Sequence, residues 1–458
     1  MSMSSNPTRQ SPLARMLAAV AAVERHEMPA VMAAFCLFFC VMGGYFSVRP
    51  VRDTVGTLIG PDRVADLWMV TWVASLAIIF FYGAVVARFR RGVFLPWTYG
   101  AVAAALALVG IALSDGGNVV AGQFFYVFIS VLNLFIISVF WSFLLELFRT
   151  EQTKRLFGVV AAGGTAGALA GPLFTDITVR TIGNSGVLFV GAALFALAIV
   201  CQRMLLSVWM RGDGPNEVHA ATPAGVRDRA IGGNPFAGVT LVLRSPYLLS
   251  VALFVVLLAS VSTFLYFEQL RLVTLTFPDV ETRTRVFARM DWIVQSLTIV
   301  SQIFITGRIA SRRGLVVLLA MVPLAMIFGF LTLAVWNTFA VLAVIFVARR
   351  FGEYAFVRPA REMLFAPLDQ ESKYKAKNFI DVAVYRGADA FVAQLQRAIE
   401  NVGFGPQSIA LLGAVTAAIW AVNGLWLGRR HDIVAANAAP LADVAAPAAP
   451  PRPAGARP

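Results

Sequence analysis

Arginine and aspartate side chains interrupt an apolar stretch near the start of this sequence. Arg49, Arg52 and Asp53 lie within "SVRPVRD", directly after a long apolar run. The guanidinium group of arginine is planar and always charged, and it binds phosphate or carboxylate through two parallel hydrogen bonds. These residues therefore indicate binding of an anion. The alternative is an interfacial anchor, because charged side chains at the end of a membrane helix commonly extend toward water.

A second group of charges lies deeper in an apolar stretch. Arg349 and Arg350 come about eleven residues after Phe339, or about 15 Å along a helix, which is close to the middle of a bilayer. A charge that faces lipid there would cost about 2.5 to 3.5 kcal/mol, so we expect these side chains to face a cavity. Buried ion pairs that join helices are the alternative. The candidate substrate-binding residues are Arg52, Asp53, Glu268, Arg271, Arg349, Arg350, Glu353, Arg358, Arg361, Arg386 and Asp389.

The composition identifies the elements that must position these charges. Hydrophobic residues make up 59% of the 458 residues, charged residues make up 14%, and the mean hydropathy is +0.74. A span needs roughly 20 apolar residues, and the sequence contains twelve such stretches. We therefore predict an all-α, multi-pass membrane protein. The predicted spans are 29–48, 66–87, 93–113, 119–146, 157–177, 186–208, 246–268, 288–307, 315–336, 338–366, 378–398 and 407–427.

The basic residues are distributed as expected for a membrane protein with both termini in the cytoplasm. A net charge of +13 could suggest a nucleic-acid polymer as partner, but the connections after the even-numbered spans up to span 10 contain most of the basic residues between the spans. We therefore expect the lipid bilayer, and no nucleic-acid polymer, as a partner. Two outer connections contain unexpected arginines, which favours a special role for them: Arg49, Arg52 and Arg63, then Arg271, Arg283, Arg285 and Arg289.

The two halves of the chain resemble each other. "ARFRRG" ends at Gly92 and "ASRRG" ends at Gly314, which is 222 residues later, and the same offset relates Arg49 to Arg271. Parallel repeats of this kind are typical of transporters that move two bundles around a central site. The predicted domains are a cytoplasmic segment at 1–27, a six-helix bundle at 28–208, a cytoplasmic linker at 209–245, a second six-helix bundle at 246–428 and a disordered, Ala/Pro-rich cytoplasmic tail at 429–458.

Several short motifs resemble those of the major facilitator superfamily. The superfamily pattern G-x-x-x-D-R-x-G-R-R is matched in part after the second span and after the eighth, although Ala87 and Ser311 replace its acidic residue. The fifth span contains the spacing G-x8-G-x3-G-P of an antiporter motif, for which close helix packing is the alternative. The resemblance implies twelve helices in two bundles and a gating role for Gly83, Arg88, Arg91, Gly307, Arg312, Gly158, Gly167, Gly171 and Pro172.

A longer stretch resembles the nucleotide-translocase branch, the ATP:ADP antiporters. It reads "EYAFVRPAREMLFAPLDQESKYKAKNFIDVAVYRG" at 353–387, and it is accompanied by "SVRPVRD" in the first span. The resemblance implies a substrate cation at Arg52 and an acidic site residue at Glu268. An acidic residue of the family falls near Ser130, and its lysine falls near Ala388 or Asp389. We therefore expect a related anionic substrate, held between Arg52 and the nearby Arg386.

The sequence favours a secondary transporter of the bacterial inner membrane that moves an organic anion, such as a nucleotide or another phosphorylated metabolite, by exchange. A proton-coupled symporter of an unrelated small solute, with Asp53, Glu268 or Asp389 carrying the proton, is the alternative. An intramembrane enzyme or scaffold is a third, weaker hypothesis, because the spans contain no histidine and the sequence contains no G-x4-G-K-[ST] loop. We expect a monomer with no catalytic residue, metal or cofactor.

Overall fold

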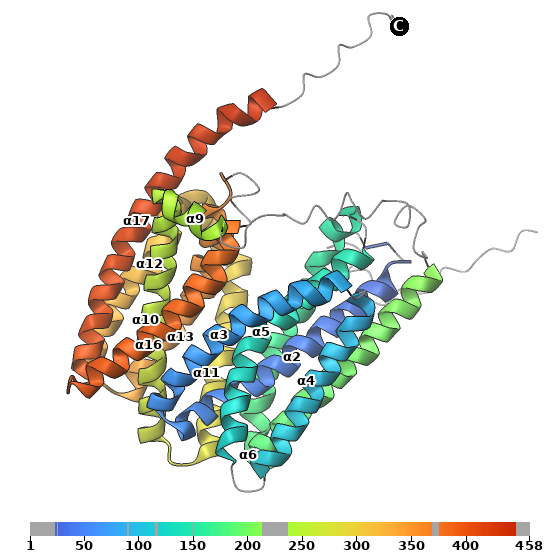
Figure 1. Cartoon of the computed structure of the whole chain (residues 1–458), viewed down its shortest axis with the longest axis horizontal. Coiled ribbons are helices and arrows are strands. Elements are labelled where there is room, and N and C mark those ends of the chain that lie inside the picture. The colour runs from blue at the N-terminus through green and yellow to red at the C-terminus, as the bar shows by residue number, and fades with distance from the viewer. Residues whose placement is uncertain are drawn as a thin grey trace, which may run out of the picture.

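The structure is a computed structural model that describes residues 23–24, 26–88, 91–114, 118–148, 150–212, 237–368 and 375–445. Within these ranges every regular element is a helix (Figure 1). The prediction of an all-α protein is confirmed. The N-terminal helices are α2 (Met28–Ile59), α3 (Pro61–Arg88), α4 (Arg91–Ser114), α5 (Val119–Leu147) and α6 (Thr150–Gly212). 

The C-terminal part contains α-helices and three π-helical segments. The π segments, named η, interrupt longer helices, and such bulges are frequent at functional sites. The elements are α9 (Ala237–Arg244), α10 (Pro246–Thr276), α11 (Val280–Ser301), η1 (Gln302–Thr306), α12 (Gly307–Val335), α13 (Phe339–Gly352), η2 (Glu353–Val357), α14 (Arg358–Leu364), η3 (Phe379–Val384), α16 (Tyr385–Asn401) and α17 (Pro406–Ala445).

Polar caps fix where several helices begin. The side chain of Asn118 accepts hydrogen bonds from the backbone N–H groups of Val120 and Ala121 at the start of α5. Ser245 caps α10 and Asp279 caps α11 in the same way. These side chains satisfy N–H groups that have no partner inside the helix, so the chain can turn sharply between consecutive spans.

Eight helical segments of the described residues are long and apolar enough to cross a membrane. One of them, Arg155–Trp209, has 55 residues, or about 80 Å of helix, which is far more than one crossing needs. It contains a non-helical residue, Gly183, with φ of 68°, so it comprises two of the predicted spans. The predicted spans 66–87, 338–366 and 378–398 also lie in helices. Their status as membrane crossings, and the count of twelve, stay predictions.

Gly314 separates two helices that are continuous in the hydrogen-bond pattern. Its φ of 73° lies in the left-handed region, where a side chain would be strained, so glycine suits the kink at the end of "ASRRG". The predicted span that starts at residue 315 begins directly after this kink. The equivalent side-chain environment around Gly92 lies outside the described residues.

Glycines allow α2 and α6 to pack closely. A Cβ atom added at Gly171 would lie 2.7 Å from the carbonyl oxygen of Gly43, and one added at Gly167 would lie 2.8 Å from the backbone nitrogen of Gly43. Gly158 differs, because a Cβ atom there would meet nothing within 4 Å. Close packing therefore accounts for Gly167 and Gly171, and the gating role of this motif stays a prediction.

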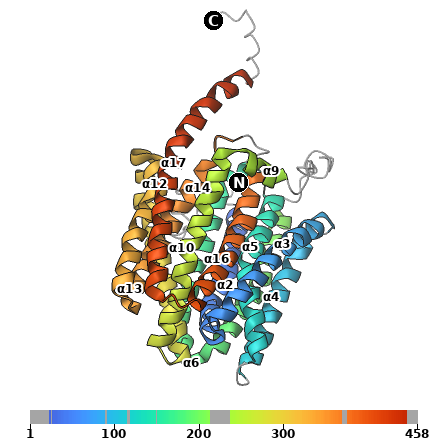
Figure 2. The same cartoon turned by 60° about the vertical axis from the view of Figure 1, so that its left-hand side comes forward.

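The described helices form two apolar cores. One core consists of residues from α2 to α6, and the other consists of residues from α9 to α17. A smaller cluster joins them through side chains such as Tyr126, Tyr266 and Phe287. In Figures 1 and 2, α16 lies beside α10 and α3, and it packs against both. The cores diverge toward the end of the molecule at which α9 lies (Figure 1).

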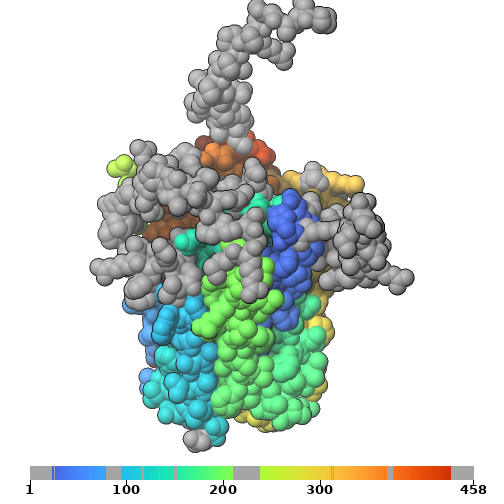
Figure 3. All heavy atoms as spheres, turned by 90° about the vertical axis from the view of Figure 1, so that its right-hand side faces the viewer, coloured from blue at the N-terminus to red at the C-terminus, as the bar shows by residue number. Residues whose placement is uncertain are grey.

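The outer surface of the helices is apolar, as a bilayer requires. In Figure 3, α4 and α6 lie side by side on one face of the molecule. Both helices contain exposed apolar residues, among them Ile111 and Val200. Exposed side chains of this kind are costly in water and favourable in hydrocarbon, so they support an integral membrane protein.

The C-terminal segment differs from its prediction. The disordered tail was predicted from residue 429, whereas α17 continues to Ala445. The alanines of this stretch explain the helix, because alanine has the highest helix propensity of all residues. The predicted linker also contains a helix, α9, while residues 213–236 lie outside the described ranges.

Candidate functional site

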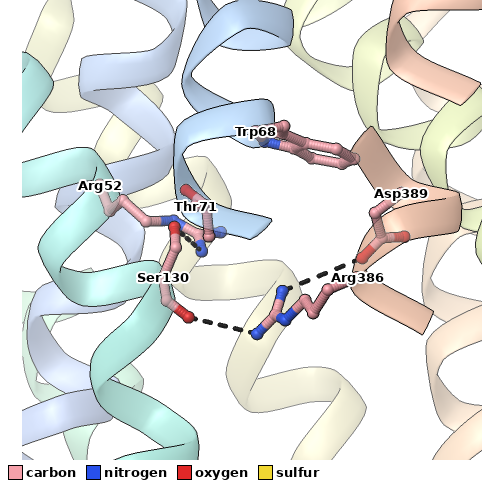
Figure 4. A pocket seen from close by; sticks show the side chains of 6 residues that line it. All are labelled: Arg52, Trp68, Thr71, Ser130, Arg386 and Asp389. Atoms are coloured by element: carbon pink, nitrogen blue, oxygen red, sulfur yellow. Dashed lines mark hydrogen bonds and ion pairs between the residues drawn. The ribbon is translucent and has the colours of Figure 1, made fainter. Parts of the chain in front are cut away.

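A small cavity lies where the two cores face each other. Its lining comes from α2, α3, α5 and α16 (Figure 4). The cavity has a volume of about 40 Å³, so it holds water-sized molecules only. A metabolite could enter only after the surrounding helices separate. The lining residues are Arg52, Trp68, Thr71, Ser130, Arg386 and Asp389.

Arg52 projects from α2 toward this cavity. Its Nε and Nη2 atoms donate to Oδ1 of Asp53 at 3.1 and 2.5 Å, and its Nη1 atom donates to the Ser130 hydroxyl at 3.3 Å. The guanidinium carbon also lies 5.4 Å from the ring centroid of Tyr126, a cation–π contact. Asp53 therefore holds the charge of Arg52 from one side, and the other side faces the cavity.

Arg386 reaches the same cavity from α16. Its Nη2 atom donates to the backbone oxygen of Ser130 at 3.2 Å. Its nearest carboxylate oxygen, Oδ2 of Asp389, lies 3.9 Å from Nη1, beyond hydrogen-bonding distance. Ser130 thus contacts both predicted clamp residues, one from each core (Figure 4). The three residues come from α2, α5 and α16, so tertiary packing brings them together.

Arg349, Arg350, Glu353 and Arg358 form a second charged cluster at the junction of α13, η2 and α14. Arg349 Nη1 donates to Glu353 Oε2 at 3.0 Å, and Arg358 Nη2 donates to Glu353 Oε1 at 3.2 Å. Arg349, Arg350 and Glu353 are buried, whereas the side chain of Arg358 is 54% exposed. Much of this cluster is therefore paired internally along the stretch α13–η2–α14, and its role in binding stays a prediction.

Asp291 was missing from the predicted set, although it is among the most buried charges near the cavity. It accepts a very short hydrogen bond from Nη1 of Arg350, and its Oδ2 atom lies 3.9 Å from Nη1 of Arg49. Arg49 belongs to α2 and Asp291 belongs to α11, so this contact joins the two cores. An aspartate inside the predicted span 288–307 was the signal in the sequence that could have identified it.

Other predicted site residues lie outside the cavity lining. Arg271 Nε donates to Glu268 Oε2 at 2.9 Å, and the amide of Asn337 donates to Glu268 Oε1 at 2.6 Å. Arg361 lies 3.4 Å from Asp381. The pair Glu268–Arg271 has the i, i+3 spacing that brings side chains together on one helix face. The structure therefore does not bring Glu268, Arg271 or Arg361 to the cavity.

The predicted gating residues are only partly described. The side chains of Gly83, Arg88 and Arg91 lie outside the described residues. Gly307 and Arg312 are exposed at the start of α12. Pro172 lies inside α6, directly after Gly171. Their gating role stays a prediction.

Ion pairs join the two cores at one end of the molecule. We call this end, at which α2 ends at Ile59 and α11 begins at Val280, the latch end. Asp176 of α6 accepts hydrogen bonds from Arg285 at 3.1 Å, Arg289 at 3.1 and 3.2 Å, and Trp292 at 3.0 Å. These arginines are among the unexpected outer ones in the sequence, and their partner Asp176 was not predicted.

Further contacts close the latch end around the last turns of α2. The hydroxyls of Thr54 and Thr284 lie 2.7 Å apart, and Arg283 Nη1 donates to the Thr57 hydroxyl at 3.1 Å. On another side, Arg397 of α16 lies 2.8 Å from Asp66 of α3. Three separate pairs of helices are therefore linked between the cores at this end.

The described residues contain no group of three His, Cys, Asp or Glu side chains that could hold a metal ion. The cavity lining combines two arginines with serine, threonine and tryptophan, and it contains one carboxylate, Asp389. Most of these side chains are hydrogen-bond donors. Such groups donate hydrogen bonds and stabilise negative charge, and they suit binding of an anion.

Known proteins resemble the chain in sequence and in fold. No family model matches it. It is 22% identical to "ADP,ATP carrier protein 1" of Chlamydia muridarum, over 92% of this chain and 90% of the carrier, and 21% identical to the protein of that name from Chlamydia trachomatis, over 92% and 91%. The crystal structure of the nucleoside transporter NupG matches 88% of this chain and 99% of its own, with a TM-score of 0.60 and 11% identity.

These comparisons first define a class. The chain has the fold of major-facilitator-type transporters, and it is an integral, multi-pass membrane protein. Within that class it shows weak but consistent homology to ADP,ATP carrier proteins. Both resemblances noted in the sequence are confirmed. These relatives are named as carriers, and the solved neighbour is named as a transporter; neither name is that of an enzyme.

Proposed function

We propose that the protein exchanges phosphate-bearing organic anions, such as nucleotides, across the membrane by alternating access. The observation that supports this most is the meeting of Arg52 and Arg386 at Ser130, in one cavity between the two cores. Arginine suits phosphate because its fork matches two phosphate oxygens. The relatives named as ADP,ATP carriers support a nucleotide and support exchange.

The balance of charge around the cavity favours a negatively charged substrate. We counted the described charges of the cavity, of the cluster around Glu353 and of the Arg49–Asp291 contact. Arginines exceed carboxylates there by two. A bound anion would therefore supply charge that the protein lacks. The six arginines are Arg49, Arg52, Arg349, Arg350, Arg358 and Arg386, and the four carboxylates are Asp53, Asp291, Glu353 and Asp389.

The proposal includes a topology. The bundles 28–208 and 246–428 would move against each other, with the segment 1–27, the linker 209–245 and the tail from 429 in the cytoplasm of a bacterial inner membrane. The basic connections support this orientation. The latch end would then face outward, and the structure would correspond to a state that is closed on the outside. We propose a monomer that binds no nucleic-acid polymer, with a gating role for the superfamily motifs.

Proton symport is a second candidate, and the geometry of Asp389 is the observation that favours it. Asp389 lines the cavity, and its contact with Arg386 is long, at 3.9 Å. A carboxylate that lacks a close cation in a buried site can exchange a proton more readily than a tightly paired one. Asp53 is a weaker candidate, because Arg52 contacts it at 2.5 Å.

Reconstitution into liposomes tests the proposal. Purified protein should take up labelled ADP several-fold faster into liposomes loaded with unlabelled ADP than into empty ones, because each inward movement requires an outward one. A pH gradient without internal ADP should leave uptake low. Uptake that follows the pH gradient and ignores internal ADP would favour symport. Transport of neutral solutes alone would exclude the exchange of phosphate-bearing anions.

A further inference from the structure

Two tyrosines from opposite cores lie between the cavity and the latch end. Tyr126 belongs to α5 and Tyr266 belongs to α10, and their hydroxyl oxygens are 2.8 Å apart. Tyr126 is fully buried and Tyr266 is 9% exposed. The cluster that joins the two cores includes both rings. This hydrogen bond therefore spans the boundary that must open if the cavity is to reach the outside.

The tyrosine pair belongs to a chain of hydrogen bonds that ends at the cavity. The indole N–H of Trp68 donates to the Tyr126 hydroxyl at 2.8 Å, and the Tyr266 hydroxyl donates to Oδ1 of Asp53 at 3.2 Å. An indole can only donate and a carboxylate can only accept, so Tyr126 donates to Tyr266. The same Oδ1 atom accepts both bonds from Arg52. One carboxylate oxygen thus connects the substrate cation to the boundary between the cores.

We propose that Tyr126 and Tyr266 are positioning residues that couple occupation of Arg52 to opening of the latch end. This inference rests on the proposed function, because it takes an anion as the ligand of Arg52. In the empty protein, Arg52 neutralises Asp53, and Asp53 can hold Tyr266 in the closed arrangement. A bound anion takes the hydrogen bonds of Arg52 and leaves the buried Asp53, which is 5% exposed, without its counter-charge.

The lost counter-charge gives the coupling its direction. A buried carboxylate without a cation is costly, so the closed arrangement becomes less stable once the anion binds. Separation of the cores then relieves this cost by exposing Asp53 to water. The empty protein lacks this drive and stays closed at the latch end. Tight exchange, in which only the loaded protein changes state, follows from the geometry.

A transport experiment separates coupling from simple structural support. Tyr266→Phe and Tyr126→Phe each remove one hydroxyl and keep the ring. We expect the ratio of ADP uptake into ADP-loaded liposomes to uptake into empty ones to fall from several-fold toward one, because the closed state of the empty protein loses a hydrogen bond, while the KM for ADP changes little. The matched control is Tyr99→Phe, because Tyr99 is fully buried and its hydroxyl has no hydrogen-bond partner. Its ratio should equal that of the unmodified protein.

A second experiment reads the conformation without any ligand. Spin labels would be placed at Thr181 in the first core and at Val402 in the second, both exposed near the latch end, after replacement of Cys36, Cys40 and Cys201. Pulsed electron resonance should give a short distance for the otherwise unmodified protein. Tyr266→Phe and Asp53→Asn should each give a second population with a longer distance between the labels. ADP should produce the same longer distance in the otherwise unmodified protein.

The outcomes distinguish the two proposals. An unchanged exchange ratio in Tyr266→Phe, together with unchanged label distances, would overturn the coupling role. Equal loss of both uptake rates with a lower melting temperature would also overturn it, because it would identify a merely structural hydroxyl. If the unmodified protein exchanges neither ADP nor another phosphate-bearing anion such as a sugar phosphate, the proposed function fails. The label distances without ligand would then still decide whether the tyrosines hold the latch end closed.

Discussion

The latch end and the cavity use the same residue types in different arrangements. At the latch end, one carboxylate, Asp176, accepts hydrogen bonds from Arg285, Arg289 and Trp292 across the boundary between the cores. In the cavity, Arg52 and Arg386 share one serine, and a single close carboxylate, Asp53, accompanies them. At the latch end, the carboxylate of Asp176 is therefore satisfied by donors of the protein. The cavity, in contrast, contains donors that an external anion could use.

This difference explains why charges of one kind can serve two tasks in one protein. A carboxylate that is saturated by donors from the other core stabilises the closed state and has little capacity for a ligand. An arginine nitrogen whose partner on the cavity side is a hydroxyl or a backbone oxygen gains more from a phosphate, because a charged acceptor forms a stronger hydrogen bond than a neutral one. The distribution of acceptors, rather than the presence of arginine, therefore separates closure from binding.

The largest expected effect comes from removal of either cavity arginine. Arg386→Ala and Arg52→Ala should abolish ADP exchange, because each loses a charge-assisted contact worth about 1.5 to 3 kcal/mol, or more than tenfold in apparent affinity. Arg386→Lys should recover only part of the rate, since a point charge lacks the planar fork. The measurement is labelled ADP uptake, with the melting temperature of each purified variant beside it.

A control variant and a double replacement sharpen this prediction. Arg203→Ala removes an exposed arginine of α6, and it should transport normally. If Arg386 merely neutralises Asp389, Arg386→Ala should lower the melting temperature and the double replacement of both residues should restore it. That result, or full transport by both single alanine variants, would assign Arg386 a structural role and no role in substrate binding.

A smaller effect is expected at the hub of the latch end. Asp176→Asn keeps the shape of the side chain but removes the charge that Arg285 and Arg289 share, so the closed state should lose stability. Thr57 is 7% exposed beside this boundary, and a cysteine placed there, in a background without the native cysteines, should react about tenfold faster with a membrane-impermeant maleimide. Asp432→Asn, at an aspartate 75% exposed on α17, is the control. An unchanged reaction rate would remove Asp176 from the latch.

The sequence predicted the cavity residues better than it predicted the latch. Arg386 could be identified because a charge deep in an apolar stretch must face the protein interior, whichever helices surround it. Arg52 could be identified because it follows a long apolar run and matches the carrier-like motif "SVRPVRD". Asp176 could not be paired with Arg289, because their contact depends on how α6 and α11 pack, and spacing along the chain contains no record of that. The arginines were noticed as unexpected outer charges, but their partner was not.

Local patterns also indicate where the site prediction was too broad. Glu268 and Arg271 are three residues apart on one helix, a spacing that favours a pair with each other, and the structure contains that pair. Arg349 and Glu353 show the same behaviour at a spacing of four. The helical tail to Ala445 was missed because an Ala/Pro-rich composition was taken for disorder, although the alanines favour a helix.

The smallest effect is expected at the α3–α16 contact of the latch end, between Arg397 and Asp66. Their side chains are 35% and 46% exposed, compared with 9% for Asp176. Exposed ion pairs contribute only about 0.2 to 1 kcal/mol, so Arg397→Gln should raise the reactivity of the cysteine at Thr57 by about fivefold at most.

Ionic strength further distinguishes the Arg397–Asp66 contact from the contacts of Asp176. Salt screens exposed charges within about 10 Å at 0.1 M, whereas a buried carboxylate is screened much less. The difference between Arg397→Gln and the unmodified protein should therefore vanish at high salt, while the effect of Asp176→Asn should persist. If Arg397→Gln matched Asp176→Asn in size at every salt concentration, exposure would not rank these contacts. Closure would then depend equally on the α3–α16 contact and the α6–α11 contact.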